Sequence, residues 1–218
     1  MTVTQWQQII RADLLKVLAE PLFWFLLLAP VLLGWMLHYV LPWLAGQFEN
    51  FSLADYYPLV LALIILTPPL YYGLILGLQV LEEKDEGVLI AVAVTPMPLR
   101  TYLFTRTAMY TLISLPLILV VHRVIGVVEI RTGELFWVAA ASSLNAPMAV
   151  MLLAAFCKNL LEGFVIGKGM SPLILLPLAM FFVPDYWHVV CGVLPTYWPI
   201  IAYFTAVDPA GSETFFYL

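Results

Sequence analysis

Charged side chains are scarce in this sequence. Only 11% of its 218 residues are Asp, Glu, Lys or Arg, while 63% are hydrophobic. Soluble domains carry about 25% charged residues, and a chain of this length cannot hide so much apolar surface in one core. The shortage of charge therefore excludes an ordinary soluble domain. It predicts a single membrane domain, residues 1–218, that crosses the bilayer several times.

Basic residues and cysteines are scarcer still. Nine Lys and Arg oppose fourteen Asp and Glu, which gives a net charge of −5. A nucleic-acid-binding protein would show a clustered basic face, so we expect no nucleic-acid partner. Cys157 and Cys191 lack the spacing of metal ligands, and no His-Glu-x-x-His pair is present. The sequence therefore predicts no metal site and no bound cofactor. We also expect no disulfide, because the topology predicted below puts the two cysteines on opposite sides of the membrane.

Long apolar segments dominate the rest of the chain. Each is near the length of about 20 residues that a helix needs to cross the hydrocarbon core. Such segments must be helices, because isolated strands cannot satisfy their backbone groups in lipid. The predicted spans are 22–44, 57–81, the stretch between Arg106 and Arg123, 135–157 and 163–183. The expected fold class is an all-α polytopic membrane protein with five clear spans.

Both ends of the chain carry further elements. Residues 4–20 are loosely amphipathic and precede Pro21, which predicts a helix lying on the membrane surface. Residues 184–207 contain Pro195 and Pro199, each of which would cost about 3 kcal/mol inside a helix. We therefore expect two short re-entrant helices at the outer surface there. The apolar residues from Thr214 to Leu218 predict the start of a sixth span.

The distribution of Lys and Arg predicts the orientation of the spans. With the N-terminus inside, the outer segments carry only Arg123 and Arg131. The inner segments carry Arg11, Lys16, Lys84, Arg100, Arg106, Lys158 and Lys168. This bias predicts a cytosolic N-terminus in a cell membrane and places the 82–100 segment in the cytosol. It also places His38, His122 and His188 near the outer surface, where we expect them to have no fixed partner.

The 82–100 segment is the most polar stretch of the chain. Glu82, Glu83, Asp85 and Glu86 precede Gly87, and the apolar run VLIAVAV then ends at Thr95-Pro96. The run is too short to cross a membrane, but it is long enough for a short helix between two turns. Such a helix offers charges and an apolar face to a cytosolic partner. The alternative is a solvated loop without a partner.

The order of these motifs resembles the permease subunits of type-2 ABC exporters. In that family the loop after the second span carries a Glu, a Glu-Gly-Thr-Leu element and a Ser/Thr-Pro turn. Here Glu82, Glu86-Gly87-Val88-Leu89 and Thr95-Pro96 occupy these places, with Val88 instead of Thr. The stretch from Asp13 to Pro21 resembles the family's N-terminal elbow helix. Residues 177–182 and 194–199 resemble its fifth span and outer hairpin.

The resemblance implies a function for the chain. The loop would dock on a separate cytosolic ATPase as a coupling helix, with two ATPase subunits per complex that bind ATP and Mg²⁺. Gly167-Lys168-Gly169 lacks the Ser or Thr of a phosphate-binding loop, so we expect no nucleotide site in this chain. The implied coupling residues are Glu82, Glu83, Asp85, Glu86, Gly87, Thr95 and Pro96.

The resemblance also implies that two protomers, identical or not, enclose the path for an amphiphilic cargo such as a drug, lipid or peptide. First, second and fifth spans would line this path. The candidate residues are Phe25, Pro68, Pro69, Tyr71, Tyr72, Phe181 and Phe182. For Pro68-Pro69 two interpretations remain open. The pair can form a kink that neighbouring helices repair, or a hinge beside the path.

Two other functions remain open from the sequence. A stand-alone transporter or channel predicts ionisable residues inside the spans; Glu162 and Lys168, near one end of a span, are the candidates. A membrane scaffold or immunity protein would bind a partner without any transport.

Overall fold

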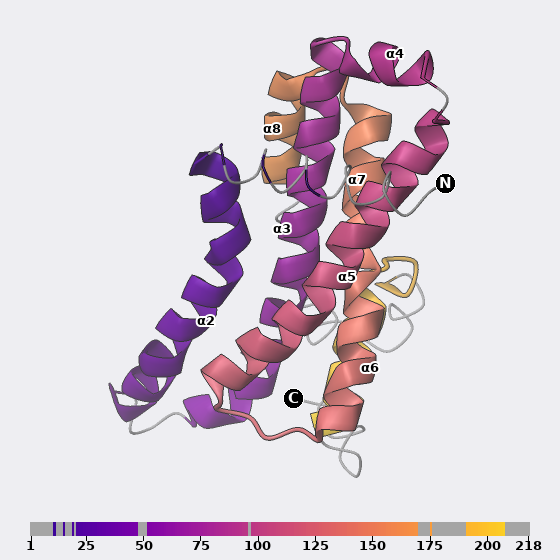
Figure 1. Ribbon diagram of the computed structural model, residues 1–218. Helices are drawn as coiled ribbons and strands as arrows, with labels where there is room; N and C mark the ends of the chain where they lie inside the picture. The colour runs from indigo at the N-terminus through magenta and orange to yellow at the C-terminus, as the bar shows by residue number, and fades with distance from the viewer. Residues whose placement is uncertain are drawn as a thin grey trace.

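The computed structural model is a bundle of helices (Figure 1). It describes residues 21–47, 52–95, 97–169 and 191–207, together with residues 11, 15, 19 and 175. No strand occurs within these residues. The elements are α2 (Pro21–Gln47), η1 (Leu53–Tyr56), α3 (Tyr57–Asp85), α4 (Val88–Ala93), α5 (Leu99–Ile125), α6 (Thr132–Ser143), α7 (Asn145–Phe156), α8 (Leu160–Gly169) and α11 (Tyr197–Val207).

Four helical segments of the described residues are long and apolar enough to cross a membrane. They are Leu28–Gln47, Leu53–Asp85, Leu99–Ile125 and Thr132–Phe156. These match the first four predicted spans. The fourth is divided at Leu144 into α6 and α7, because Pro147 has no N–H to donate to the carbonyl of Ser143. Of the predicted fifth span the structure describes α8 and residue 175.

Several predictions fall on residues that the structure does not describe. They are most of the 4–20 surface helix, Pro96, the rest of the fifth span with Phe181 and Phe182, residues 184–190 of the outer hairpin, and the start of a sixth span at 214. Within the hairpin, residues 191–207 contain α11, whose N-terminus follows turns at 192–196.

α3 is the central helix of the bundle. In the most apolar stretch of α3, 67% of the residues are buried inside the bundle, whereas 17% are buried in the corresponding stretch of α2. α5, α6, α7, α8 and α11 pack around α3, and α2 stands to one side (Figure 1). α2 therefore presents an exposed apolar surface to lipid or to another chain. This surface includes Phe25, Leu32, Trp35, Tyr39 and Trp43.

The proline pair in the middle of α3 does not break the helix. Pro68 and Pro69 cannot donate to the carbonyls four residues earlier, which belong to Ile64 and Ile65. Each of these two carbonyl oxygens accepts a hydrogen bond from a side-chain hydroxyl instead. Thr67 Oγ1 donates to Ile64 O over 2.8 Å, and Ser142 Oγ of α6 donates to Ile65 O over 3.0 Å. The structure thus favours the repaired kink over a hinge.

Glycines allow α3 to approach its neighbours closely. A Cβ at Gly73 would collide with the carbonyl oxygen of Ala146 and would lie 2.6 Å from the Cβ of Ala149, both on α7. On α8, a Cβ at Gly163 would lie 2.5 Å from Leu81 of α3. Small residues allow this kind of close helix contact in membrane bundles.

Polar contacts at the far end from α4 join α2 to α3 and α5, and α5 to α11. His38 Nδ1 lies 2.9 Å from Ile125 O, and Tyr57 Oη donates to Leu41 O over 3.2 Å. His122 is buried, and its Nε2 lies 3.0 Å from Tyr203 Oη. The expectation that these histidines lack fixed partners is therefore wrong for His38 and His122. In an apolar bundle a buried ring nitrogen is costly unless it is hydrogen-bonded.

The close contact between α3 and α7 gives a first prediction. We expect Gly73→Ala to destabilise the protein by about 1–3 kcal/mol, because the added methyl group overpacks a backbone contact. Unfolding in detergent micelles, followed by circular dichroism, measures the change. Gly46→Ala is the matched control, since a Cβ there meets no atom within 4 Å. Equal stability of both variants would contradict the close packing.

Candidate functional site

The candidate site is the end of the bundle where α3 turns into α4. α3 continues four residues past the predicted end of its span, so Glu82, Glu83 and Asp85 lie on its last turn rather than in a loop. With 29 residues α3 is about 43 Å long, which exceeds the hydrocarbon thickness. Gly87 then turns the chain with a φ of 75°, a conformation that favours glycine.

α4 is the short helix that the sequence predicts between Gly87 and Pro96. Leu89 packs on the core, whereas Ile90 and Val94 are 73% and 84% exposed. At its end, Thr95 Oγ1 donates to Val92 O over 2.7 Å and accepts from Met97 N over 3.3 Å. α4 therefore holds a fixed place on the bundle and turns an apolar face outward.

The four acidic residues before Gly87 have different surroundings. Glu86 is exposed and Glu82 is half-buried. Asp85 is exposed and accepts a hydrogen bond from Leu160 N of α8 over 2.8 Å. Glu83 is 5% exposed and forms an ion pair with Arg106 of α5 over 2.7 Å. Glu83 therefore points inward, and Asp85 joins the end of α3 to the start of α8.

Arg106 organises a polar cluster between α3 and α5. We call Gln79, Glu83, Tyr102, Arg106 and Tyr110 the Arg106 cluster. Arg106 Nη1 donates to Glu83 Oε2 over 2.7 Å and to Tyr102 Oη over 3.0 Å, and Nη2 donates to Gln79 Oε1 over 2.9 Å. Tyr110 Oη donates to the same Gln79 oxygen over 3.2 Å.

The Arg106 cluster satisfies a charge that is completely buried. Arg106 has no exposed surface, and an unpaired guanidinium there would be very costly. Tyr102 Oη also donates to Glu83 Oε2 over 3.2 Å, and the Arg106 guanidinium lies 5.1 Å from the Tyr102 ring centre. Two helices thus meet through charge-assisted hydrogen bonds, which are the strong ones in proteins.

Sequence reasoning missed this cluster. The sequence predicts Arg106 at the inner end of the third span, whereas α5 begins at Leu99 and Arg106 lies two turns inside it. The spacing of the polar residues along the two helices does hint at the cluster. Tyr102, Arg106 and Tyr110 follow one another at four-residue intervals, and Gln79 and Glu83 do the same on α3. Such residues share one helix face.

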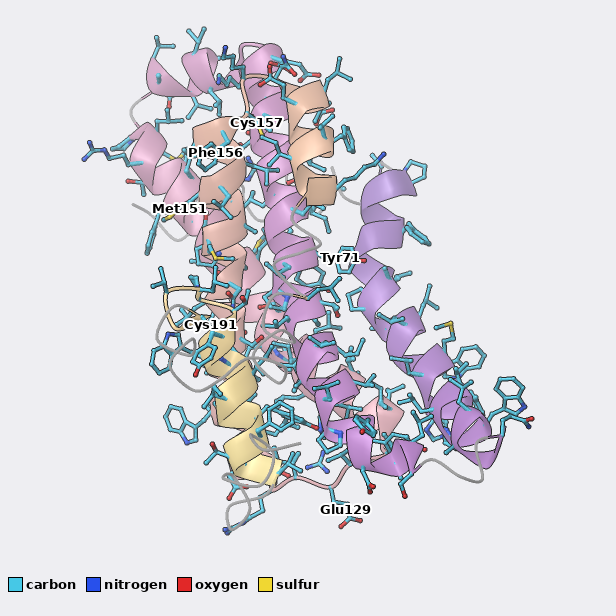
Figure 2. All side chains as sticks on the ribbon, turned by 180° about the vertical axis from the view of Figure 1, so that it is seen from behind. Tyr71, Glu129, Met151, Phe156, Cys157 and Cys191 are labelled. Carbon is cyan, nitrogen blue, oxygen red and sulfur yellow. The ribbon has the colours of Figure 1, made fainter. Side chains whose placement is uncertain are left out.

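The loop between α7 and α8 lies at the same end of the bundle as α4 (Figure 1). Asn159 Oδ1 accepts from Glu162 N over 2.9 Å, and Glu162 Oε2 accepts from Lys158 N over 2.7 Å. These contacts cap the first turn of α8. Burial raises the pKa of the Cys157 thiol, and the nearby Glu162 carboxylate adds to this effect. Cys157 and Cys191 are both free, and Figure 2 shows them at different levels of the bundle.

The candidate path residues do not share one surface. Phe25 is exposed on α2, and Tyr71 is half-buried on the side of α3 that faces α2 (Figure 2). Tyr72 is buried, with its ring centre 6.4 Å from that of Tyr110. Pro68 and Pro69 are also buried. A path on the surface of this chain could contact Phe25 and Tyr71 directly, whereas the other three would act through their neighbours.

Comparison with known proteins places the chain in a family. Residues 13–218 match the family described as fluoroquinolones export permease protein Rv2686c-like, and the chain belongs to this family. Two curated relatives, fluoroquinolones export permease proteins MT2760 and Rv2686c, come from the CDC 1551 / Oshkosh and H37Rv strains of Mycobacterium tuberculosis. Each is 28% identical to this chain over 204 residues, which cover 91% of this chain and 81% of the relative. No solved structure matches the chain.

The family match confirms the resemblance to exporter permease subunits that the sequence motifs indicate. With four helical segments able to cross a membrane, the chain is a multi-pass membrane protein of an export permease family.

The buried ion pair gives a second prediction. We expect Arg106→Leu to destabilise the protein by about 3–5 kcal/mol, because Glu83 is left charged and unpaired in a buried place. The double variant Glu83→Leu/Arg106→Leu should regain most of this loss, since apolar residues can replace a buried pair. The free energies of unfolding of the wild type, Arg106→Leu and the double variant are compared in detergent micelles. Arg131→Leu is the control, because its ion pair with Glu134 is exposed and should contribute little. Equal losses for the single and double variants would contradict this account.

Proposed function

We propose that this chain is the membrane-spanning permease subunit of an ATP-driven exporter, and that a separate cytosolic ATPase binds it at α4. The placement of α4 carries this proposal. It lies beyond the end of a span, it is held on the bundle through Leu89, and it exposes Ile90 and Val94. A membrane protein that displays a short apolar helix outside its spans has a surface for a soluble partner.

The surroundings of α4 suggest how the partner recognises it. The apolar face would fill a groove on the ATPase, and the exposed charges of Lys84 and Glu86 beside it would fix the register. Glu82, Gly87 and Thr95 complete this surface in the proposal. Gly87 and Thr95 form the two turns that present α4, so they act through the shape of the segment.

We place α4 in the cytosol, together with the N-terminus. Lys84, Arg100 and Lys158 are exposed at this end of the bundle, and an excess of basic residues is typical of cytoplasmic segments. ATP and Mg²⁺ would bind to the partner, with two ATPase subunits for each pair of permease protomers in the cell membrane. This chain would bind no cofactor of its own.

A second permease protomer completes the proposed exporter. The exposed aromatic and aliphatic side chains of α2 offer a surface for it or for lipid. The cargo would pass between the protomers, beside Phe25 and Tyr71. The two relatives are named for fluoroquinolone export, and we propose an aromatic, amphiphilic drug of this kind as the cargo.

The distribution of charge favours an external ATPase over ion-driven transport. An ion-coupled transporter needs ionisable groups along its spans. In α5 the buried basic residues are Arg106 and His122, which lie about 24 Å apart along the helix. No Asp, Glu, Lys, Arg or His lies between them in the sequence. Arg106 is already paired with Glu83, so these groups form no relay across the bundle.

The apolar face of α4 gives the third prediction. A charge at its centre would have to be buried in the partner groove, so Ile90→Asp should reduce association with the ATPase at least tenfold. The tagged chain is purified from membranes of its own host, and Mg²⁺-dependent ATP hydrolysis that elutes with it is measured. Ile90→Leu is the control and should retain the activity. The proposal fails if the wild-type chain elutes without ATP hydrolysis, or if Ile90→Asp retains it in full.

The exposed charge beside α4 gives the fourth prediction. Reversal of the side-chain charge in Glu86→Lys should weaken association with the ATPase several-fold. The effect should shrink at high salt, because exposed charges are screened. Glu129→Lys is the matched control, since Glu129 is exposed at the opposite end of the bundle (Figure 2). Association of purified subunits is measured in detergent at two salt concentrations. Equal weakening by both variants would show a general effect of net charge instead of a local contact.

A further inference from the structure

Among the described residues, α4 packs chiefly on its two neighbours along the chain, α3 and α5. It has six residues and is joined to α3 by the Gly87 turn and to α5 by residues 94–98. A partner that displaces α4 therefore pulls on the ends of α3 and α5. The two ends move together only if a firm contact joins them close to α4. Among the described residues, the Arg106 cluster supplies it, because Glu83 lies at the last turn of α3 and Tyr102 at the first turn of α5.

We propose that the Arg106 cluster is the positioning element that makes α4 and the adjoining ends of α3 and α5 move as one body. This inference rests on the proposed function, since it assigns the route by which the ATPase acts on the spans. Glu83 then has a different role from its acidic neighbours. It faces Arg106 and transmits the displacement inward, while Glu86 faces the partner.

The shape of the guanidinium suits this role. Nη1 of Arg106 binds Glu83 and Nη2 binds Gln79, which lies one helical turn earlier on α3. One planar group thus holds two points on the neighbouring helix. Because both hydrogen bonds are directional, they resist sliding of α5 along α3 as well as rotation about its axis. A lysine in this place could not present the same planar fork.

Stability alone does not account for a charged cluster at this place. Apolar residues of similar size often replace a buried ion pair without loss of stability, but apolar contacts carry no direction. The cluster also contains a buried donor, Gln79 Nε2, that has no hydrogen-bond partner among the described residues. A buried group of this kind calls for an explanation. Fixed geometry between two helices is a property that the polar cluster supplies and an apolar one lacks.

The test measures the placement of α4 and the efficiency of transport separately. Spin labels on Ala93→Cys in α4 and Val120→Cys at the far end of α5 report one distance by double electron–electron resonance. The background carries Cys157→Ala and Cys191→Ser. In Glu83→Leu/Arg106→Leu we expect the distance distribution to become at least twice as wide. In the unlabelled complex with its ATPase, cargo transported per ATP should fall at least fivefold.

Two further variants make the test decisive. Ser143→Ala is the control, because it removes one buried hydrogen bond within α6 and should leave the distribution and the transport ratio unchanged. Arg106→Lys keeps the charge but loses the planar fork of the guanidinium. The width of the distance distribution and the transport ratio should therefore lie between those of the wild type and the double variant. If the double variant does not fold, Arg106→Lys provides the test instead.

Wild-type values of both readouts in a folded cluster variant would overturn the inference. If the wild-type chain binds no ATPase, the proposed function fails. The distance distribution then decides by itself whether the cluster positions α4.

Discussion

Inside this bundle a buried polar group is costly unless it finds a partner within the protein, because lipid offers no hydrogen bonds. This constraint accounts for the main features of the structure. The carbonyls freed by Pro68 and Pro69 accept from the hydroxyls of Thr67 and Ser142. The buried guanidinium of Arg106 meets a carboxylate, an amide and a phenol. The contacts of Ser142 and Arg106 also join neighbouring helices, α6 to α3 and α5 to α3.

Features of the structure that depend on a single segment can be predicted from the sequence. Length and hydropathy located α2, α3, α5 and the α6–α7 segment, since a helix in lipid must cover a fixed thickness. The turn at Gly87 and the short helix after it followed from composition, because glycine and proline restrict the backbone locally.

The features that depend on two segments together were not predictable in the same way. The sequence alone places Arg106 at the end of a span, because a lone arginine between apolar residues carries no sign of a partner elsewhere. For the same reason the sequence groups Glu83 with the acidic residues that we expect to face the cytosol. Their pairing requires that α3 and α5 lie side by side with these faces together, and this is information about packing. The four-residue spacing on both helices was the available hint.

The contact between Ser142 and the carbonyl of Ile65 also concerns the order in which the protein is made. The acceptor belongs to the second membrane crossing and the donor to the fourth, 77 residues later in the chain. During synthesis α3 therefore enters the bilayer with one carbonyl that its own helix cannot satisfy. That carbonyl must use water or the insertion machinery until α6 arrives. The central helix of the bundle thus reaches its final form only after the crossings that surround it have been inserted.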